Sequence, residues 1–247
     1  MLRLSPNHWL LNRPIAHRGL WGKNIIENSI TAYQNAVDKK YPIEIDVYLT
    51  KDGHLVSFHD SNLKRMTGDD GNIYDKTLNE LNSLYLLDEK GNKSSEKIPT
   101  FDQVLALAEN KVPLLIEIKN QPDSSVVDKV VERLKSYKGE FALQSFNPLY
   151  ILRVKKLAPS FIRGVLGTAD ANDKSKFKNF IVKTMPFNFL IKPDFVSYED
   201  KFIPKFAKKT KKTYCISWTI TNSEREEKVS PFVDNIIFEN YVPKKYL

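Results

Sequence analysis

The apolar residues of this chain fall into short runs separated by longer stretches of helical period. Nine runs have the length and alternation of β-strands: residues 14–16, 43–48, 55–58, 114–118, 141–143, 163–166, 195–197, 214–218 and 235–238. Helical spacing is found at 29–38, 101–109, 125–137 and 148–157. Strands that alternate with helices favour a parallel sheet with crossover helices. The closed form of that sheet has eight strands, so we expect at least one run to lie outside it.

The length predicts one domain. A chain of 247 residues matches a single (β/α)8 TIM barrel, an α/β fold, and no Pro-, Gly- or Ser-rich linker divides it, so we predict one domain over residues 1–247. The polar segment 61–98, after His59-Asp60, is too long for an ordinary connection and is interpreted as a small insertion over one end of the barrel. Thr100 is expected to cap the helix that begins at Phe101.

The composition is that of an ordinary globular chain, with 41% hydrophobic and 28% charged residues. No segment approaches the roughly 18 apolar residues of a membrane span, and no signal peptide is evident, so we expect a cytoplasmic protein without stable membrane insertion. The single cysteine, Cys215, is predicted to be a buried strand residue. The net charge of +8 is interpreted as solvated helix faces, and no nucleic-acid motif accompanies it. The oligomeric state has no signature in the sequence.

Acidic residues occur at alternate positions of two predicted strands. Glu44 and Asp46 are two residues apart, so they point to one face of a strand whose other face is apolar. Glu117 and Lys119 repeat the pattern. Neighbouring buried carboxylates are costly unless a cation or proton neutralises them. Three oxygen ligands without His-rich or Cys-rich spacing predict one hard divalent ion, Mg²⁺ or Ca²⁺, with Mn²⁺ as a further candidate. Lys119 could balance the charge of Glu117 in a salt bridge, and this could be true alongside a substrate role.

Two of the four histidines follow predicted strands. His17 precedes Arg18 after the first apolar run, and His59 precedes Asp60 after the third. Barrel enzymes carry their active sites at the C-terminal ends of strands, which is where we expect both histidines. Phosphodiester cleavage requires a cation and an arginine to hold the phosphoryl charge. It also requires one base for the nucleophile and one acid for the leaving alkoxide, and these residues, with the predicted ion, can supply all four groups. No Gly-rich phosphate loop or Ser-centred elbow competes with this interpretation.

Motifs spread along most of the chain, in order, resemble those of the glycerophosphodiester phosphodiesterase family of phospholipase C-like TIM barrels. The motifs are His17-Arg18-Gly19, Glu27-Asn28-Ser29, Glu44-Ile45-Asp46-Val47, Thr50-Lys51-Asp52-Gly53, His59-Asp60 with Leu63, Arg65 and Thr67, Ile98-Pro99-Thr100-Phe101, Ile116-Glu117-Ile118-Lys119, Ser145-Phe146 and Trp218-Thr219. The chain departs from the family pattern at Ile26, where Pro is usual, and in its closing segment 234–239.

The resemblance implies a role for each matching position. A divalent ion would bind Glu44, Asp46 and Glu117, and His17 and His59 would form the acid–base pair. The substrate would contact Arg18 and Lys119 near the phosphate, together with Phe146 and Trp218.

The predicted function is metal-dependent hydrolysis of small-molecule glycerophosphodiesters to sn-glycerol 3-phosphate and an alcohol. The alternatives are a lysophospholipase D-like or phospholipase C-like phosphodiesterase on the same barrel, and a non-catalytic barrel that binds phosphorylated ligands. No Ser, Cys or Asp nucleophile is evident, so the attacking oxygen would come from water or from the substrate. The apolar segment 185–190 could touch lipid, but we predict that it is the buried face of an outer helix.

Overall fold

The computed structural model describes residues 4–168, 185–203 and 213–244. It divides into two compact units, one of Ala16–Phe141 and the other of Met1–Ile15 with Ala142–Leu247. Within the described residues, no helix combines the length and apolar character needed to cross a membrane.

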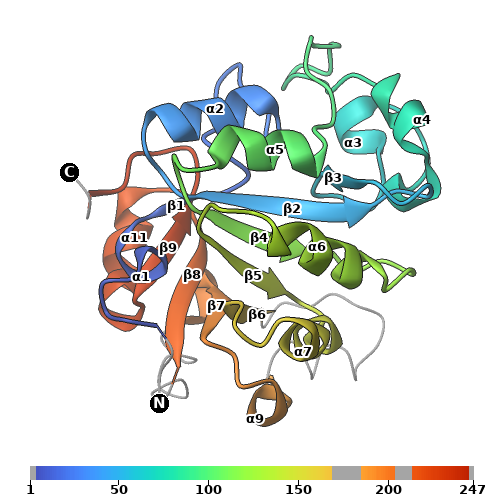
Figure 1. The fold of residues 1–247 in the computed structure, drawn as a ribbon. Coiled ribbons are helices and arrows are strands. Elements are labelled where there is room, and N and C mark those ends of the chain that lie inside the picture. Colours follow the sequence, from blue (N-terminus) through green and yellow to red (C-terminus); the bar gives the residue numbers. More distant parts are fainter. Residues whose placement is uncertain (1–3, 169–184, 204–212, 245–247) are drawn as a thin grey trace. The chain divides into compact units, whose positions relative to one another are not determined.

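A short parallel sheet lies at the centre of the unit Ala16–Phe141. Strand β2 (Ile43–Leu49) pairs in parallel with β1 (Ile15–Ala16) on one side and with β4 (Leu114–Ile118) on the other. Strand β3 (Leu55–Ser57) instead runs antiparallel to β2, with Ser57 opposite Val47 (Figure 1). The run 55–58 is therefore the one expected to lie outside the eight parallel strands, since it is antiparallel to its neighbour.

Helices α2 (Ile30–Asp38) and α5 (Phe101–Ala108) pack against each other, with α2 also against β2 (Figure 1). The Ser29 side chain caps α2, and Thr100 caps α5 in a capping box with Gln103, as predicted for Thr100. Helix α6 (Val126–Lys135) buries a valine-rich face against β3 and β4. The caps of Ser29 and Thr100 fix where α2 and α5 begin, and hence where the preceding loops end.

The segment 61–98 folds beside the end of β2. It contains α3 (Lys64–Thr67), the 3₁₀ turn η1 (Ile73–Asp75) and α4 (Leu78–Asn82). Its apolar side chains join the β2–β3 hairpin in one buried cluster, made of Tyr48, Val56, Phe58, Leu63, Met66, Ile73, Leu81, Leu86 and Ile98. The hairpin and the segment after it thus share one small core.

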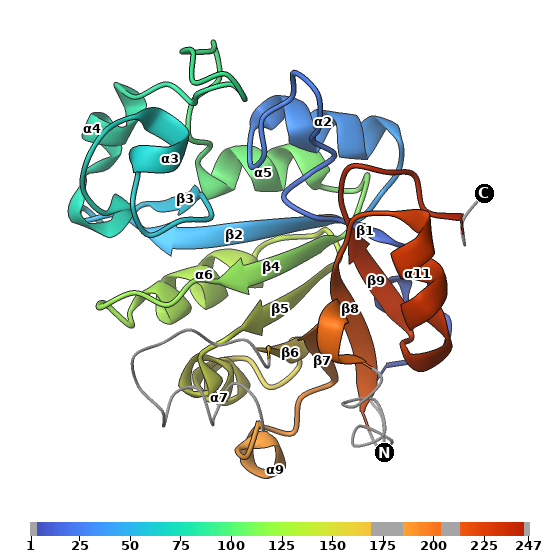
Figure 2. The ribbon, with the colours of Figure 1, turned by 180° about the vertical axis from the view of Figure 1, so that it is seen from behind.

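Within its described residues, the other unit has five consecutive parallel strands. They are β5 (Phe141–Ser145), β6 (Arg163–Gly167), β7 (Phe195–Glu199), β8 (Tyr214–Ile220) and β9 (Asn235–Phe238) (Figure 2). The helical elements among its described residues are α1 (Trp9–Asn12), α7 (Pro148–Leu157), α9 (Asn188–Ile191), α11 (Ser223–Val229) and the 3₁₀ turns η2 (Asp200–Phe202) and η4 (Ser230–Phe232). The Asn235 amide donates to the carbonyls of Leu10 and Arg13, which ties α1 to β9.

Two predictions about this unit have opposite outcomes. Cys215 is buried in β8, as predicted, and burial raises the pKa of its thiol to about 12. The prediction that segment 185–190 is a buried helix face is wrong, because Phe189 and Leu190 are 71% and 47% exposed. Helix α9 has only four residues and turns Ile191 inward, so its remaining apolar side chains are left at the surface.

Candidate active site

Three acidic side chains converge on two neighbouring strands of the unit Ala16–Phe141. Glu44 and Asp46 lie on β2, and Glu117 on β4 is the register partner of Asp46. The three residues are 2%, 1% and 7% exposed, and one carboxylate oxygen from each lies within 4.8 Å of the others. The alternation of side chains along each strand and the parallel pairing of β2 with β4 therefore bring together the three acids that the sequence predicted as metal ligands.

Lys119 balances part of this negative charge. Its Nζ lies 2.9 Å from a Glu117 oxygen and 3.2 Å from an Asp46 oxygen. Burial alone would lower the pKa of Lys119, but the charges of the two carboxylates raise it above its usual value. The salt bridge expected between Lys119 and Glu117 is thus present, and it leaves the ammonium beside the acidic cluster.

The carboxylates of β2 have different environments. Burial opposes ionisation of Asp46, yet nearby positive charges, led by Lys119, hold its pKa well below the usual range, and Asn28 donates to it at 3.1 Å. Burial and the charges of Asp46 and Glu117 raise the pKa of Glu44 well above its usual range. Of these two carboxylates, Glu44 is therefore the one whose negative charge the protein stabilises less.

The turn after β1 is attached directly to this cluster. The Arg18 backbone N–H, which follows His17, donates to Glu44 at 3.0 Å, and the Arg18 guanidinium lies 3.7 Å from Asp46. Arg18 and Gly19 both have positive φ, 56° and 85°. A Cβ on Gly19 would lie 2.8 Å from the Ala32 carbonyl carbon in α2, so only glycine lets the turn approach that helix. His17 is half-buried at the start of this turn.

His59 reaches the site by a different route from the one predicted. The expectation that it ends a barrel strand is wrong, because β3 is antiparallel and returns along β2. The Phe58 backbone N–H then donates to the Asp46 carbonyl oxygen at 3.1 Å, and the Tyr48 hydroxyl donates to the His59 carbonyl at 3.4 Å. The hairpin, rather than a strand end, brings His59 towards the acids.

A chain of charged hydrogen bonds links His59 to Arg18. The Nδ1 atom of His59 lies 2.7 Å from Asp60, which accepts from Arg65 Nε at 2.6 Å. Arg65 also donates to Glu27 at 2.5 Å, and Glu27 accepts from Arg18 at 2.9 Å.

The carboxylates of this chain are held ionised. Burial would raise the pKa of Asp60, but hydrogen bonds from His59 and Arg65 lower it. Burial would likewise raise the pKa of Glu27, but its contacts with Arg65 and Arg18 lower it. An ionised Asp60 only accepts hydrogen bonds, so it requires the proton on Nδ1 of His59 and leaves Nε2 for proton exchange.

Sequence reasoning assigned no role to four residues of this arrangement: Glu27, Asn28, Asp60 and Arg65. They occur in motifs that carry the family resemblance, and that is the only signal of them in the sequence. Glu27 and Asn28 are buried at 8% and 3% exposure, in the loop before α2, where no periodicity marks a buried polar residue. Arg65 comes from α3 in the segment 61–98, so its partners become visible only in three dimensions.

Phe146 and Trp218 lie in the other unit of the chain. Phe146 follows β5 and Trp218 lies on β8, and their rings make an edge-to-face contact with centroids 5.6 Å apart. Both residues are half-buried. An aromatic pair of this kind offers a partly accessible apolar surface to a ligand.

The donor set of Glu44, Asp46 and Glu117 fits a hard divalent ion. It consists of carboxylate oxygens, the ligands that Mg²⁺ and Ca²⁺ prefer. With all three carboxylates ionised, the ammonium of Lys119 leaves two negative charges, which a divalent ion would neutralise. The guanidinium of Arg18 lies 3.7 Å from Asp46, but Arg18 is also paired with Glu27, and these two residues together add no net charge.

Comparison with known proteins identifies a family. The model of the glycerophosphoryl diester phosphodiesterase family matches residues 17–238. A glycerophosphodiester phosphodiesterase of Caldanaerobacter subterraneus subsp. tengcongensis is 39% identical over 161 residues, which are 62% of this chain and 65% of that protein, slightly under two thirds of its length. A lysophospholipase D of Rattus norvegicus is 36% identical over 139 residues, 53% of this chain and 43% of the rat protein.

A solved structure extends the likeness to the fold. A phosphodiesterase of Oleispira antarctica, in complex with the product sn-glycerol-3-phosphate, superposes with a TM-score of 0.79 at 24% identity, covering 93% of each chain. The fold predicted from the sequence, a (β/α)8 TIM barrel, is confirmed.

Proposed function

This chain belongs to the glycerophosphoryl diester phosphodiesterase family, whose members are phosphoric diester hydrolases, and we propose that it hydrolyses glycerophosphodiesters to sn-glycerol 3-phosphate and an alcohol. The observation that carries the proposal is the buried triad of Glu44, Asp46 and Glu117 next to Lys119 and Arg18. This arrangement supplies negative ligands for a cation and positive groups for phosphoryl oxygens within one unit of the chain.

We assign the divalent ion to the three carboxylates, with Mg²⁺, Ca²⁺ or Mn²⁺ as candidates. When bound, the ion would withdraw charge from the phosphoryl oxygens as a Lewis acid. Arg18 and Lys119 would hold the same oxygens, Arg18 through its planar fork and Lys119 as a point charge. Phe146 and Trp218 are assigned to substrate binding on their half-buried aromatic surface.

We assign the two proton transfers to His17 and His59. In the first half-reaction, His17 takes the proton of the substrate's own free hydroxyl, whose oxygen forms a bond to phosphorus. The bond from phosphorus to the alcohol oxygen breaks, and His59 donates a proton to that oxygen. Water then opens the cyclic phosphate with the two roles reversed, which returns both histidines to their starting state.

We assign the attack to the substrate hydroxyl because no Ser, Cys or Asp nucleophile is evident in the sequence. A well-oriented intramolecular group can lower a barrier by roughly 7–11 kcal/mol. An analogue with hydrogen in place of that hydroxyl should therefore bind similarly and turn over very slowly. Equal kcat for the analogue and the natural diester would leave water as the nucleophile of the first step.

The deciding experiment measures release of glycerol 3-phosphate from glycerophosphocholine by the full chain. EDTA should abolish turnover, and Mg²⁺, Ca²⁺ or Mn²⁺ should restore it. Replacing His17 or His59 with Ala should each lower kcat by roughly 10²–10⁴-fold, since each handles a different proton. Full activity after chelation, or near-normal kcat in either folded variant, would contradict the corresponding assignment.

A second substrate class is tested in the same assay. The rat relative is named a lysophospholipase D, so lysophosphatidylcholine is compared with glycerophosphocholine at equal concentration. A higher kcat/KM for the lysolipid would move the proposal to the lipid form of the substrate. The single buried Cys215 agrees with a reducing compartment, and we propose the cytoplasm as the location.

A further inference from the structure

The outer faces of α7 and α9 carry exposed apolar side chains. Leu149 on α7 is 66% exposed, and Phe189 and Leu190 on α9 are 71% and 47% exposed. The two helices pack against each other, and the Lys155 ammonium on α7 donates to the Leu190 carbonyl at 2.5 Å. Isolated exposed apolar residues need no explanation, but three on adjoining helices form a patch.

The charged residues of the two described segments that carry this patch are all basic. Segments 146–163 and 185–193 contain no Asp or Glu, whereas they contribute Arg153, Lys155, Lys156 and Lys192 next to the apolar residues. Leu149, Arg153 and Lys156 are spaced i, i+4 and i+7, and all three are exposed, so they share the outer face of α7. By contrast, α6 and α11 mix acidic and basic residues.

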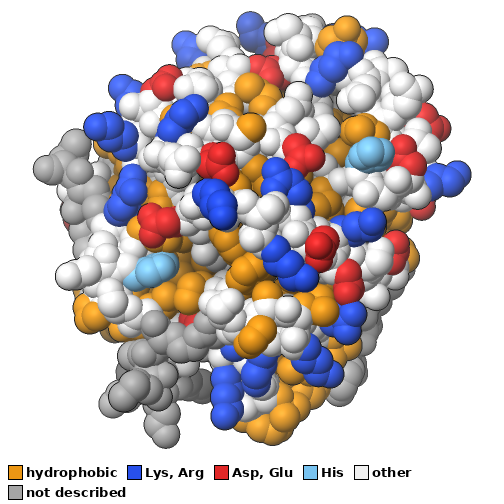
Figure 3. Space-filling model, in the orientation of Figure 1, with side chains coloured by type: hydrophobic (Ala, Val, Ile, Leu, Met, Phe, Trp, Pro, Cys, Tyr) orange, Lys and Arg blue, Asp and Glu red, His pale blue; other side chains and the backbone are white. Residues whose placement is uncertain are grey.

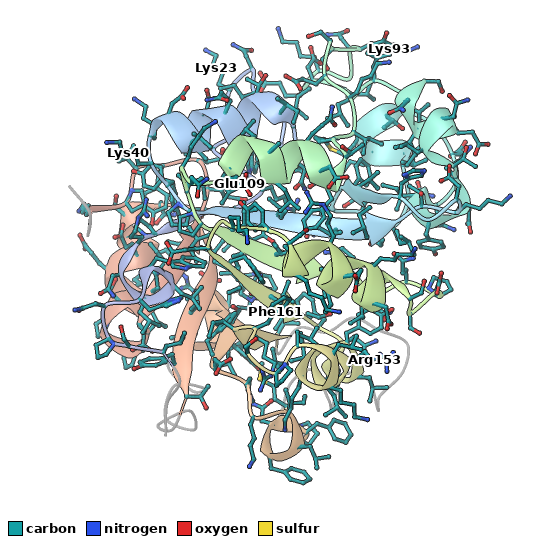
Figure 4. The ribbon with its side chains drawn as sticks, in the orientation of Figure 1. Lys23, Lys40, Lys93, Glu109, Arg153 and Phe161 are labelled. Atoms are coloured by element: carbon teal, nitrogen blue, oxygen red, sulfur yellow. The ribbon has the colours of Figure 1, made fainter. Side chains whose placement is uncertain are left out.

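The pictures agree with this distribution. Blue and orange side chains lie together at the lower edge of the space-filling view, over α7 and α9 (Figure 3). Arg153 lies on the outer side of α7 (Figure 4). The patch and its cations are therefore on the same exposed surface of the unit.

We propose that this surface, made of Leu149, Arg153, Lys156, Phe189, Leu190 and Lys192, docks on a phospholipid bilayer that carries anionic headgroups. Aromatic and aliphatic side chains would enter the interface between headgroups and acyl chains, while the basic residues contact lipid phosphates. A protein partner fits less well, because lysine is depleted in the core of protein interfaces. The docking is peripheral, and it concerns where the chain binds, independently of what it hydrolyses.

The test is sedimentation of the full chain with two kinds of vesicle, phosphatidylcholine alone and phosphatidylcholine mixed with phosphatidylglycerol. Binding should be much stronger to the anionic vesicles and should fall at high salt. The variant Phe189→Ser/Leu190→Ser should bind at least roughly tenfold more weakly. The variant Lys156→Gln/Lys192→Gln should lose roughly 10- to 30-fold in affinity.

Matched controls distinguish the contribution of this surface to binding from the effect of removing any exposed apolar or basic residue. Phe232→Ser/Val242→Ser removes two apolar residues that are 42% and 60% exposed in the same unit, and Lys23→Gln/Lys39→Gln removes two exposed charges from the other unit. Both should bind the anionic vesicles like the parent, and all variants should keep the parent circular dichroism spectrum.

Three outcomes would overturn the proposal. The first is equal binding to neutral and anionic vesicles, and the second is equal loss of binding in the control variants. The third is no vesicle binding, combined with self-association that disappears in Phe189→Ser/Leu190→Ser, which would assign the surface to a second copy of the chain.

Discussion

At the residue scale, the contact between His59 and Asp60 decides how that histidine can act. The 2.7 Å contact fixes the ring and its tautomer, and Arg65 holds Asp60 from its other side. Glu27 and Asp46 also interact electrostatically with His59, and the Tyr48 hydroxyl donates to its carbonyl oxygen. We infer that Asp60 is a positioning residue, which would act through His59.

We predict that Asp60→Asn lowers kcat by roughly 10- to 100-fold with little change in KM, less than the loss on removing His59 itself. An amide no longer requires the proton on Nδ1, so the ring and its tautomer are held less firmly. Asp60→Glu should recover part of the activity. Parental kcat in Asp60→Asn would show that the contact has no catalytic consequence.

Cys215 gives a prediction of the pH dependence of stability. Its pKa is raised to about 12 by burial, whereas an unfolded thiol titrates at roughly 8.5. Above that pH the unfolded chain loses a proton that the folded chain keeps, so stability falls as pH rises. The free energy of unfolding should lose about 1–2 kcal/mol between pH 8 and 10 through this thiol.

Urea unfolding of the parent and Cys215→Ala at both pH values measures this loss by difference. All other titrating groups are common to the two proteins, so they cancel. Identical pH slopes for the two proteins would contradict the raised pKa.

At the element scale, the close approach of the β1 turn to α2 positions Arg18. Gly19→Ala adds a Cβ at 2.8 Å from the Ala32 carbonyl carbon and imposes alanine on a φ of +85°. We expect the free energy of unfolding to fall by about 1–3 kcal/mol from the strained conformation alone, and by more because of the clash. The displaced turn should also lower kcat/KM, because the Arg18 N–H would leave Glu44.

Gly53→Ala is the matched control for that change. Gly53 has nearly the same φ, +84°, but no atom lies within 4 Å of an added Cβ. It should show only the conformational cost in a thermal melt and retain its kcat/KM. Equal destabilisation of the two variants would mean that the approach to α2 does not matter.

At the scale of the whole molecule, a divalent ion should stabilise the folded chain by mass action. The Glu44, Asp46 and Glu117 oxygens come from two strands that are far apart in sequence, so an unfolded chain does not present this site. At an ion concentration of about 100 times Kd, the gain is about 2.7 kcal/mol. For a chain of this size we expect Tm to rise by about 5–10 °C relative to EDTA.

The comparison variants for that melt are Glu117→Gln and Glu132→Gln. Glu117→Gln removes one ligand and should abolish most of the rise, whereas Glu132→Gln changes an exposed acid on α6 and should keep it. A rise of equal size in both variants would place ion binding elsewhere on the chain.

The sequence by itself determined the order of the strands, the four longest described helices and much of the acidic cluster. Apolar runs separated by helical period marked β2, β4 and α7, and alternation put Glu44 and Asp46 on one face of β2. These features depend on neighbours along the chain, so local periodicity is sufficient to find them. Thr100 as a helix cap and Cys215 as a buried residue were predictable for the same reason.

Only the tertiary structure decided how His59 arrives, which polar residues accompany it and which apolar residues stay exposed. The antiparallel course of β3 depends on pairing with β2, and a short apolar run has the same pattern in either direction. The chain from Asp60 through Arg65 and Glu27 to Arg18 joins separate segments, which no local pattern can register. Phe189 and Leu190 are exposed because α9 is too short to bury them, and burial is decided by neighbours in space.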